Sequence, residues 1–282
     1  MLPVVSLADE NDRDWFTLPP LLMETTYKIQ CGASLGTAFI LGHPTTVENE
    51  SYYVLITAKH VLEAFKEDKA TLHLRKYVND HYERFPIQLT IRKNGKPLWV
   101  THPGADIAAL RPIIPQSANI RSIRLLSTGL LADDKMLKEF ELQPGDELMA
   151  LGFPFGAESN EAGFPILRSG RVASYPLLPT SLNKTFLLDF EVFKGNSGGP
   201  VFLYDRNRFY GDKVHFGRTR FIAGLVSKEQ ELTEKIQSLE QVTVKKHRLS
   251  LAIIVHAKLI RETIEILFPE IPIPEPTEKD DT

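Results

Sequence analysis

Three short stretches of the sequence carry a histidine, a carboxylate and a serine, the side chains that nucleophilic catalysis uses. LITAKHVL places His60 at the end of an apolar run, where a short helix is expected to begin. PGADIAAL places Asp106 after a Pro-Gly turn, and FKGNSGGPVF places Ser197 among three glycines. Taken singly, each is more often structural: a core histidine, a turn aspartate and a hairpin-turn serine. Taken together, they supply the base, the orienting acid and the nucleophile that activate a serine hydroxyl.

The serine motif also matches G-x-S-x-G, the nucleophile elbow of α/β-hydrolases. That elbow requires a helix after the serine, whereas Pro200 and VFLY predict a strand. Its partners must also follow the serine in the order acid, histidine. The downstream histidines, His215, His247 and His256, lie in no loop with another mark of a site. We therefore exclude the elbow.

LITAKHVL, DIAAL and GNSGGPVF together resemble the chymotrypsin-like, trypsin-fold serine proteases, whose chain order is also His, Asp, Ser. GDELMALGFPFG, LRSGRVAS and GLVS are most similar to the bacterial branch that includes the HtrA proteases. The resemblance covers about residues 36–268 and includes no PDZ domain. It implies an all-β fold of two six-stranded antiparallel β-barrels with a C-terminal helix.

The resemblance implies a serine endopeptidase that hydrolyses peptide bonds. Ser197 would attack the peptide carbonyl while His60 takes its proton, and Asp106 would hold the imidazole in the right tautomer. The backbone N–H groups of Gly195 and Ser197 would form the oxyanion hole. A side chain at position 195 would hinder that turn, which explains the glycine.

Substrate binding is expected beside the serine. By resemblance, Ser227 supports Asp106 through a hydrogen bond, and residues 224–227 pair with the substrate backbone. Asp189, Glu191 and Glu229 lie on the segments expected to flank the pocket for the residue before the scissile bond. A partly desolvated carboxylate there favours Arg or Lys. The alternative, that all three acids face solvent, stays open.

Asn196 stands where secreted relatives carry an aspartate that pairs with a freshly cut N-terminal amine. An uncharged amide cannot form that ion pair, so we expect no activation by N-terminal cleavage. A reading from a different class also stays open: a catalytically silent protease-fold module that binds peptides or a protein partner. The combination of His60, Asp106, Ser197 and Gly195 favours the enzyme, because a pure binder does not need all four.

The composition limits the remaining function classes. The 33 basic and 36 acidic side chains give a formal charge of −3 without a basic stripe, which argues against nucleic acid. The other histidines lack metal-ligand spacing, and no phosphate or dinucleotide motif appears, so we expect no metal and no cofactor. With Cys31 as the single cysteine, no signal peptide and no membrane-spanning run, we expect a soluble, cytoplasmic protein. Its expected partners are polypeptide substrates, with a regulatory protein partner left open.

The elements that must position these residues are mostly strands. Runs of β-branched and aromatic residues between turn signals predict strands over residues 36–42, 52–58, 71–78, 84–91, 97–100, 106–112, 145–154, 165–175, 184–193, 199–205 and 219–227. Helical spacing predicts helices over residues 59–68, 229–241 and 256–268. We expect an N-terminal extension over residues 1–24 and a peptidase domain over residues 25–268, with two sub-barrels that meet within residues 113–144. Residues 269–282, proline-rich and acidic, should be disordered.

Overall fold

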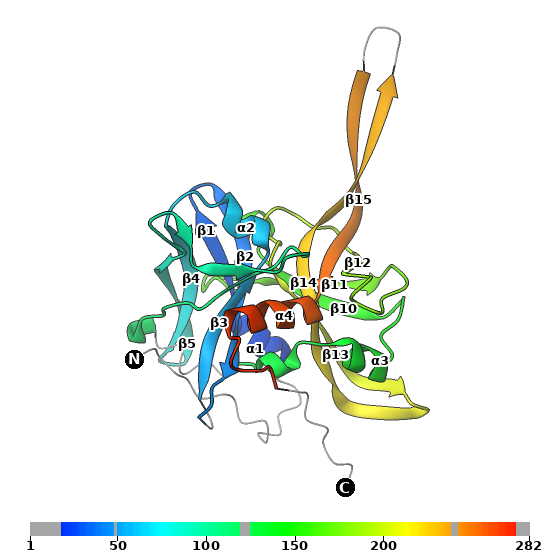
Figure 1. Ribbon diagram of the computed structural model, residues 1–282, viewed down its shortest axis with the longest axis horizontal. Helices are drawn as coiled ribbons and strands as arrows, with labels where there is room; N and C mark the ends of the chain where they lie inside the picture. Colours follow the sequence, from blue (N-terminus) through cyan, green and yellow to red (C-terminus); the bar gives the residue numbers. More distant parts are fainter. Residues whose placement is uncertain (1–17, 48–49, 119–124, 238–241, 275–282) are drawn as a thin grey trace.

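The computed structural model describes residues 18–47, 50–118, 125–237 and 242–274 of the 282-residue chain (Figure 1). The fold is mainly antiparallel β-sheet in two halves. The first half is a seven-stranded sheet with the strand order β5-β4-β1-β2-β3-β9-β8. Its strands are β1 (Thr26–Cys31), β2 (Ser34–Pro44), β3 (Ser51–Thr57), β4 (Lys69–Val78), β5 (His81–Thr90), β8 (Trp99–Thr101) and β9 (Ala108–Leu110). The short strands β6 (Arg92–Lys93) and β7 (Lys96–Pro97) pair only with each other.

The second half is a closed barrel with the order β10-β11-β12-β15-β14-β13. Its strands are β10 (Glu147–Gly152), β11 (Ile166–Val172), β12 (Thr185–Asp189), β13 (Pro200–Tyr210), β14 (Lys213–Gln237) and β15 (Val242–His256). The expected all-β fold and one six-stranded barrel are therefore confirmed. A second closed barrel is not shown, because the described strands of the first half leave β5 and β8 as open edges.

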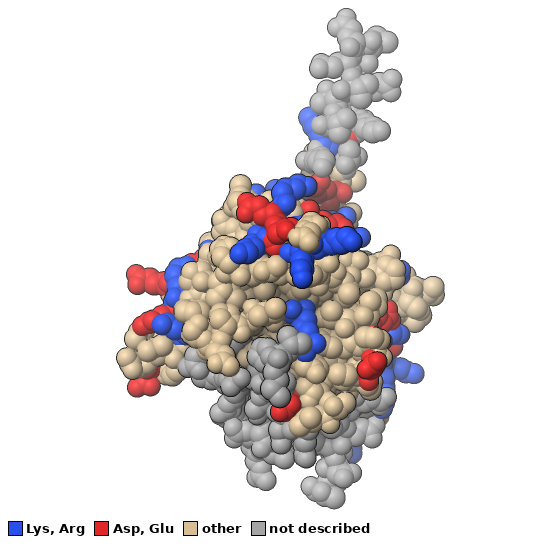
Figure 2. Space-filling model, turned by 60° about the vertical axis from the view of Figure 1, so that its left-hand side comes forward, with Lys and Arg blue, Asp and Glu red and all other residues tan. Residues whose placement is uncertain are grey.

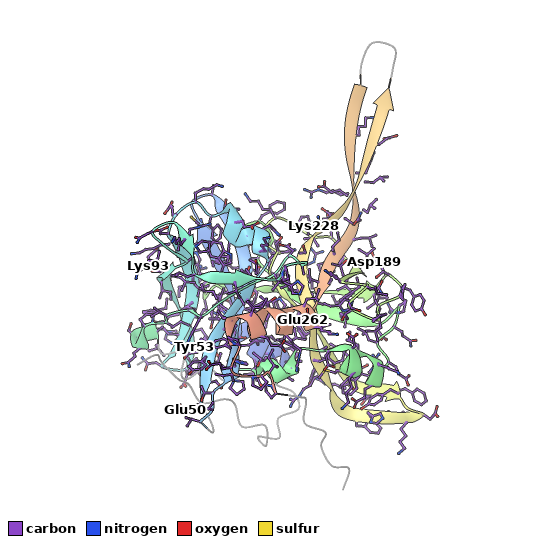
Figure 3. All side chains as sticks on the ribbon, viewed as in Figure 1. Glu50, Tyr53, Lys93, Asp189, Lys228 and Glu262 are labelled. Carbon is purple, nitrogen blue, oxygen red and sulfur yellow. The ribbon has the colours of Figure 1, made fainter. Side chains whose placement is uncertain are left out.

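Burial follows the position of each strand in the sheet. The central strands β2 and β3 are buried on both faces over most of their length. The edge strand β5 exposes many of its side chains and buries only Ile87 and Leu89. Strands covered on both faces read as continuous apolar runs, which is why FILG and YYVLIT stand out in the sequence. Figure 3 shows the side chains of both halves on the ribbon.

Four α-helices lie in the described ranges: α1 (Leu18–Thr25), α2 (Lys59–Ala64), α3 (Asp134–Glu139) and α4 (Ala257–Leu267). The helices predicted over residues 59–68 and 256–268 are thus confirmed, each with shorter bounds. Helix α4 buries Leu259, Ile260 and Ile264 on one face. It contacts β8 and β9 of the sheet as well as β14 and β15 of the barrel, so it fastens the two halves together. None of the helices in the described ranges is both long and apolar enough to cross a bilayer.

The helix predicted over residues 229–241 is wrong for residues 229–237, and residues 238–241 lie outside the described ranges. Residues 229–237 belong to β14, which pairs with β15 from Gly224↔His256 out to Gln237↔Val242. A helix over residues 229–237 would leave residues 242–248 of β15 without a partner strand. Pairing with a distant, β-rich segment overrides the local helical spacing of the charged residues.

Candidate active site

His60 is the second residue of helix α2, which begins two residues after strand β3 ends. The helix lies tightly against β2, because a Cβ atom at Gly36 would stand 2.5 Å from a methyl carbon of Val61. Glycine at this position is therefore what lets the helix sit so close to the sheet. The strand and the helix together fix the backbone from which His60 projects.

Asp106 lies in the connection between β8 and β9 and contacts His60 twice. The His60 Nδ1 and Asp106 Oδ2 atoms are 2.8 Å apart, and the His60 backbone N–H donates to Asp106 Oδ1 at 3.0 Å. An ionised carboxylate accepts hydrogen bonds, so Nδ1 carries the proton and Nε2 is left as the basic nitrogen. The side chain of His60 is half-exposed.

Ser227, on barrel strand β14, donates its hydroxyl to Asp106 Oδ2 at 2.5 Å. Burial of Asp106 opposes ionisation, but the hydrogen bonds from His60 and Ser227 outweigh it and hold the pKa of the carboxyl at about 2. Asp106 is therefore charged at neutral pH. The structure thus brings together three residues that the sequence singled out, from both halves of the fold.

Ser197 lies in the loop between β12 and β13, and this loop is held from both sides. The Thr37 N–H of β2 donates to the Ser197 carbonyl at 2.8 Å, and the Gly198 N–H donates to the Val226 carbonyl of β14 at 2.7 Å. Within the described residues the Ser197 hydroxyl makes no hydrogen bond with the His60 imidazole. In enzymes without substrate such hydrogen bonds are often long and tighten only in the substrate complex.

The turn before Ser197 orients the Gly195 peptide. The Asn196 N–H donates to the Phe193 carbonyl at 3.0 Å, and Gly195 has a φ of +102° at the third position, as a type II turn requires. The Lys194 carbonyl accepts from the Phe155 N–H at 2.7 Å. Because the peptide is trans, the Gly195 N–H points away from Phe155. A Cβ atom at Gly195 would also stand 2.2 Å from the Phe153 carbonyl oxygen, so only glycine fits.

Two backbone donors beside Ser197 remain available. The N–H groups of Gly195 and Ser197 have no acceptor within the described residues, whereas the N–H groups of Asn196, Gly198 and Gly199 all have one. Adjacent unpaired N–H groups form a concavity that stabilises negative charge. The loop is therefore built like an oxyanion hole next to the candidate nucleophile.

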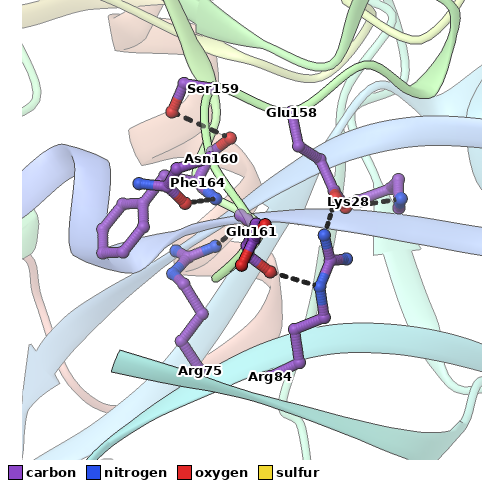
Figure 4. Close-up of polar contacts among 9 residues, drawn as sticks. Lys28, Arg75, Arg84, Glu158, Ser159, Asn160, Glu161 and Phe164 are labelled. Atoms are coloured by element: carbon purple, nitrogen blue, oxygen red, sulfur yellow. Dashed lines mark hydrogen bonds and ion pairs between the residues drawn. The ribbon is translucent and has the colours of Figure 1, made fainter. Parts of the chain in front are cut away.

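The loop that contains Phe155 is strapped to the other half of the fold (Figure 4). Glu158 accepts Lys28 Nζ of β1 at 2.6 Å and also pairs with Arg84 of β5. Arg75 of β4 donates to the Gly163 carbonyl at 2.6 Å. Partial burial of Glu158 raises its pKa, but the hydrogen bonds from Arg84 and Lys28 lower the pKa by more than burial raises it. The pKa of Glu158 therefore lies below its usual value. The contacts of this strap join segments far apart in the sequence, so no local motif predicts it.

The acids predicted to bind substrate differ in their surroundings. Asp189 is exposed on β12 (Figure 3), where it pairs with Arg171 of β11, and Glu191 is half-buried in the loop that leads to Ser197. Glu229 is nearly buried, with 9% of its side chain exposed; one oxygen lies 3.5 Å from Arg248 Nε. Its Oε1 atom is buried without a hydrogen-bond partner among the described residues. Of the three acids, Glu229 is the one withdrawn from solvent.

A small cavity of about 10 Å³ is lined in part by Asn196, which precedes Ser197, and by Ile166 and Phe190. This volume is close to the minimum for one water molecule. The Oδ1 atom of Asn196 is buried without a hydrogen-bond partner in the described part of the chain. No group of three or more His, Cys, Asp or Glu side chains that could hold a metal occurs among the described residues.

The model of the family described as trypsin-like peptidase domain matches residues 35–211, which include His60, Asp106 and Ser197. A comparison with curated proteins found no match. Among solved structures, the protease Anisep from Arthrobacter nicotinovorans is 14% identical, with 86% of this chain and 94% of that chain covered and a TM-score of 0.48. The thermostable serine protease AL20 from an extremophilic microorganism is 12% identical (89% and 100% covered, TM-score 0.49). An inactive mutant form of Rv3671c from M. tuberculosis H37Rv is 15% identical (97% and 100% covered, TM-score 0.45).

Proposed function

The chain belongs to the family of trypsin-like peptidase domains, and on this basis we propose that it is a serine endopeptidase. Ser197 is the nucleophile, His60 the general base and acid, and Asp106 the acid that orients His60. One observation carries the proposal: Asp106 makes two hydrogen bonds with His60 and one with Ser227, which lies in the other half of the fold. A carboxylate held in this way keeps the imidazole in the tautomer that leaves Nε2 basic.

In the reaction, the Ser197 hydroxyl adds to the peptide carbonyl while its proton moves to His60 Nε2. The carbonyl oxygen becomes an oxyanion that accepts hydrogen bonds from the N–H groups of Gly195 and Ser197. One such donor is worth about 10²–10³ in rate. His60 then gives its proton to the leaving amine as the C–N bond breaks, and a water molecule, activated by His60, hydrolyses the acyl-enzyme in the same two steps.

The charge of Asp106 stabilises the imidazolium formed in both steps. The pKa of Asp106, held at about 2 by His60 and Ser227 against the effect of burial, keeps the carboxylate ionised at neutral pH. Asp106 therefore stays an anion and does not take the proton from His60.

We assign substrate binding to the part of β14 that begins at Ser227. Ser227 marks the strand that would pair with the substrate backbone, and Glu191 and Glu229 flank the pocket beside it. The nearly buried Glu229, with an unpaired carboxylate oxygen, is the acid best placed to attract a basic side chain. A cleavage profile dominated by small apolar residues before the scissile bond would remove Glu229 from the pocket.

Within the family we place the chain in the HtrA-like branch, on the similarity of residues 145–156, 167–174 and 224–227 to that branch. These segments form much of β10, β11 and the middle of β14, which surround the Ser197 loop. The single cysteine, Cys31, agrees with a cytoplasmic location.

Turnover of an unstructured protein substrate tests the proposal. Wild type should cleave it, and Ser197→Ala and His60→Ala should each lose most of the activity. Asp106→Asn should also be severe, because the same change in a related triad costs about 10⁴ in kcat. If wild type binds the substrate but never cleaves it under several buffer conditions, the chain is instead a silent module that binds peptides or a protein partner.

A further inference from the structure

Beyond the barrel, β14 and β15 continue as a two-stranded ribbon that stands clear of the body (Figure 1). The ribbon comprises residues 231–237 of β14 and residues 242–248 of β15, paired from Glu231↔Arg248 to Gln237↔Val242. In the space-filling view, basic and acidic side chains of the described residues gather at the top of the body, below the part drawn in grey (Figure 2). Two paired strands without a third strand or a covering helix are only marginally stable in water.

The ribbon leaves the barrel through a series of irregularities. The β14–β15 register shifts between Val226 and Lys228 and again between Glu229 and Glu231, and Ser250 on the opposite strand has a φ of 54°. Bulges of this kind bend and twist a strand pair, and they are frequent beside active sites. Here they occur directly after Val226, the residue whose carbonyl holds Gly198 of the nucleophile loop.

One edge of β14 loses its partner strand at this point. Up to Val226 the edge is filled by the segment that follows Ser197: Leu225 pairs with Pro200, and the Val226 N–H donates to the Gly199 carbonyl at 2.9 Å. From Ser227 to Gln237, no strand among the described residues pairs with this edge, while β15 occupies the other. A strand edge that pairs with no other strand among the described residues therefore begins at Ser227, beside the Ser197 loop, and runs out along the ribbon.

We propose that the ribbon is an extended seat for the substrate, in which the polypeptide on the amino side of the scissile bond pairs with β14 from Ser227 outward. The proposal rests on the proposed function for placing the scissile bond at Ser197. It goes beyond the short strand at residues 224–227, because it adds residues 228–237 of β14 as a binding surface.

The direction of the substrate follows from the barrel. All strand pairs in the barrel are antiparallel. Strand β14 runs outward from Val226 to Gln237, so a strand added antiparallel to it runs inward, and its carboxyl end arrives at Ser197. The residues that precede the scissile bond therefore pair with β14 from Ser227 outward, and those farther from the bond lie on the ribbon.

Recognition on this edge is by main-chain hydrogen bonds. These bonds require an extended chain but impose little sequence preference. The described side chains near the edge support this, because Lys228, Glu231 and Glu234 are exposed and carry both signs of charge. Leu232 is 55% exposed and offers apolar surface to an added strand. The ligand is thus an unfolded or extended polypeptide segment.

A trimmed variant tests the proposal. Glu231 and Arg248 are paired, so residues 232–247 can be replaced by an Asn-Gly turn, the loop that a two-residue hairpin prefers. Peptides with one fixed cleavage site are extended by about eight unstructured residues, on the amino side or on the carboxyl side, to match the reach of a strand. Amino-side extension should raise kcat/KM of the full chain about three- to tenfold, from several weak cross-strand contacts. The trimmed variant should show no such gain.

Binding to the Ser197→Ala variant gives a second readout that needs no turnover. The Kd of a fluorescein-labelled amino-extended peptide, measured by anisotropy, should be about three- to tenfold lower with the intact ribbon than with the trimmed one. N-methylation of alternate amides in the extension should abolish the difference. This arm separates the two proposals: if wild type never cleaves but the ribbon still tightens binding, the proposed function fails and this inference stands.

Several results would overturn the inference. One is an equal gain from amino-side extension in the trimmed variant, provided that its thermal unfolding shows it to be folded. Another is a gain that appears only for carboxyl-side extension. A third is a change of oligomeric state on trimming, measured by light scattering, without a change in peptide binding; in that case the edge pairs two copies of this chain.

Discussion

The Ser227 hydroxyl of the barrel and the Asp106 carboxylate of the seven-stranded sheet are joined by a 2.5 Å hydrogen bond. The carboxylate oxygen that accepts it, Oδ2, is also the one that holds His60 Nδ1. The orientation of His60 is therefore set by contacts from both halves of the fold, so the site forms only when the two halves are packed together.

Ser227→Ala should lower kcat about tenfold with a smaller effect on KM, because it removes one hydrogen bond to a charged acceptor. It should also weaken the folded state more at pH 7 than at pH 2. The pKa of Asp106 is depressed, so its stabilising contribution is present above its unfolded value of 3.8 and is lost as the pH falls through about 2. Kinetics and urea unfolding at both pH values check this. Ser227→Thr, which keeps the hydroxyl, is the matched control; equal losses in both variants would contradict the assigned hydrogen bond.

Glu158→Gln should lower kcat three- to tenfold by loosening the loop that holds the Lys194 carbonyl and hence the Gly195 N–H, since one misplaced oxyanion donor costs up to about 10²–10³. The change leaves Lys28 and Arg84 without their anionic partner. The matched control is Glu83→Gln, which breaks an exposed ion pair with Lys76 on the same sheet. A lower melting temperature with unchanged kcat would show that the strap serves stability alone.

His256 should make the fold less stable as the pH falls from about 6.5 to about 4. Its side chain is fully buried, and neither ring nitrogen has a hydrogen-bond partner among the described residues. Burial lowers the pKa of His256 to about 4, against a smaller opposing effect of Asp134. Between pH 4 and 6.5 the unfolded state binds more protons, so the protein loses about 3 kcal/mol of stability across that window.

His256→Leu should flatten this dependence in urea unfolding at pH 7 and pH 5. Part of the slope should remain, because burial also lowers the pKa of His43 and His73. An unchanged slope in His256→Leu would mean that His256 is not buried in its neutral form.

Removal of residues 1–17 should leave the reactivity of Ser197 unchanged. Asn196 carries no charge to pair with a new N-terminal amine, and the cavity that it lines has room for about one water molecule. Trimming must stop before Leu18, because α1 buries Leu18 and Leu22 in the core. The rate of labelling by a serine-directed reagent compares the two forms. Labelling that begins only after trimming would contradict this account of Asn196.

The sequence predicted the parts of the site that short motifs encode. His60, Asp106 and Ser197 each stand in a local pattern of strand end, turn or glycine cluster, and their order along the chain restricted the chemistry. The contact between Phe155 and the Lys194 carbonyl and the pairing of Glu158 with Lys28 and Arg84 join distant segments, so no local pattern encodes them.

The misassigned segment shows the same limit. Residues 229–237 combine charges and apolar residues at helical spacing, yet they form a strand because β15 pairs with them. The runs of β-branched and aromatic residues did not predict β1 or β15 either. Strand stability depends on a partner elsewhere in the chain, and helical spacing alone cannot reveal that partner.

The central claim is that Ser197 is an activated nucleophile, and covalent labelling by a fluorophosphonate followed by mass spectrometry tests it most directly. The Ser197 oxygen should displace fluoride from phosphorus, so that wild type gains one phosphonyl group on Ser197. Ser197→Ala should not be labelled, and His60→Ala should be labelled far more slowly, although both should keep their stability within about 1–2 kcal/mol. Wild-type protein that stays unlabelled, or that is labelled equally well after His60→Ala, would contradict the account.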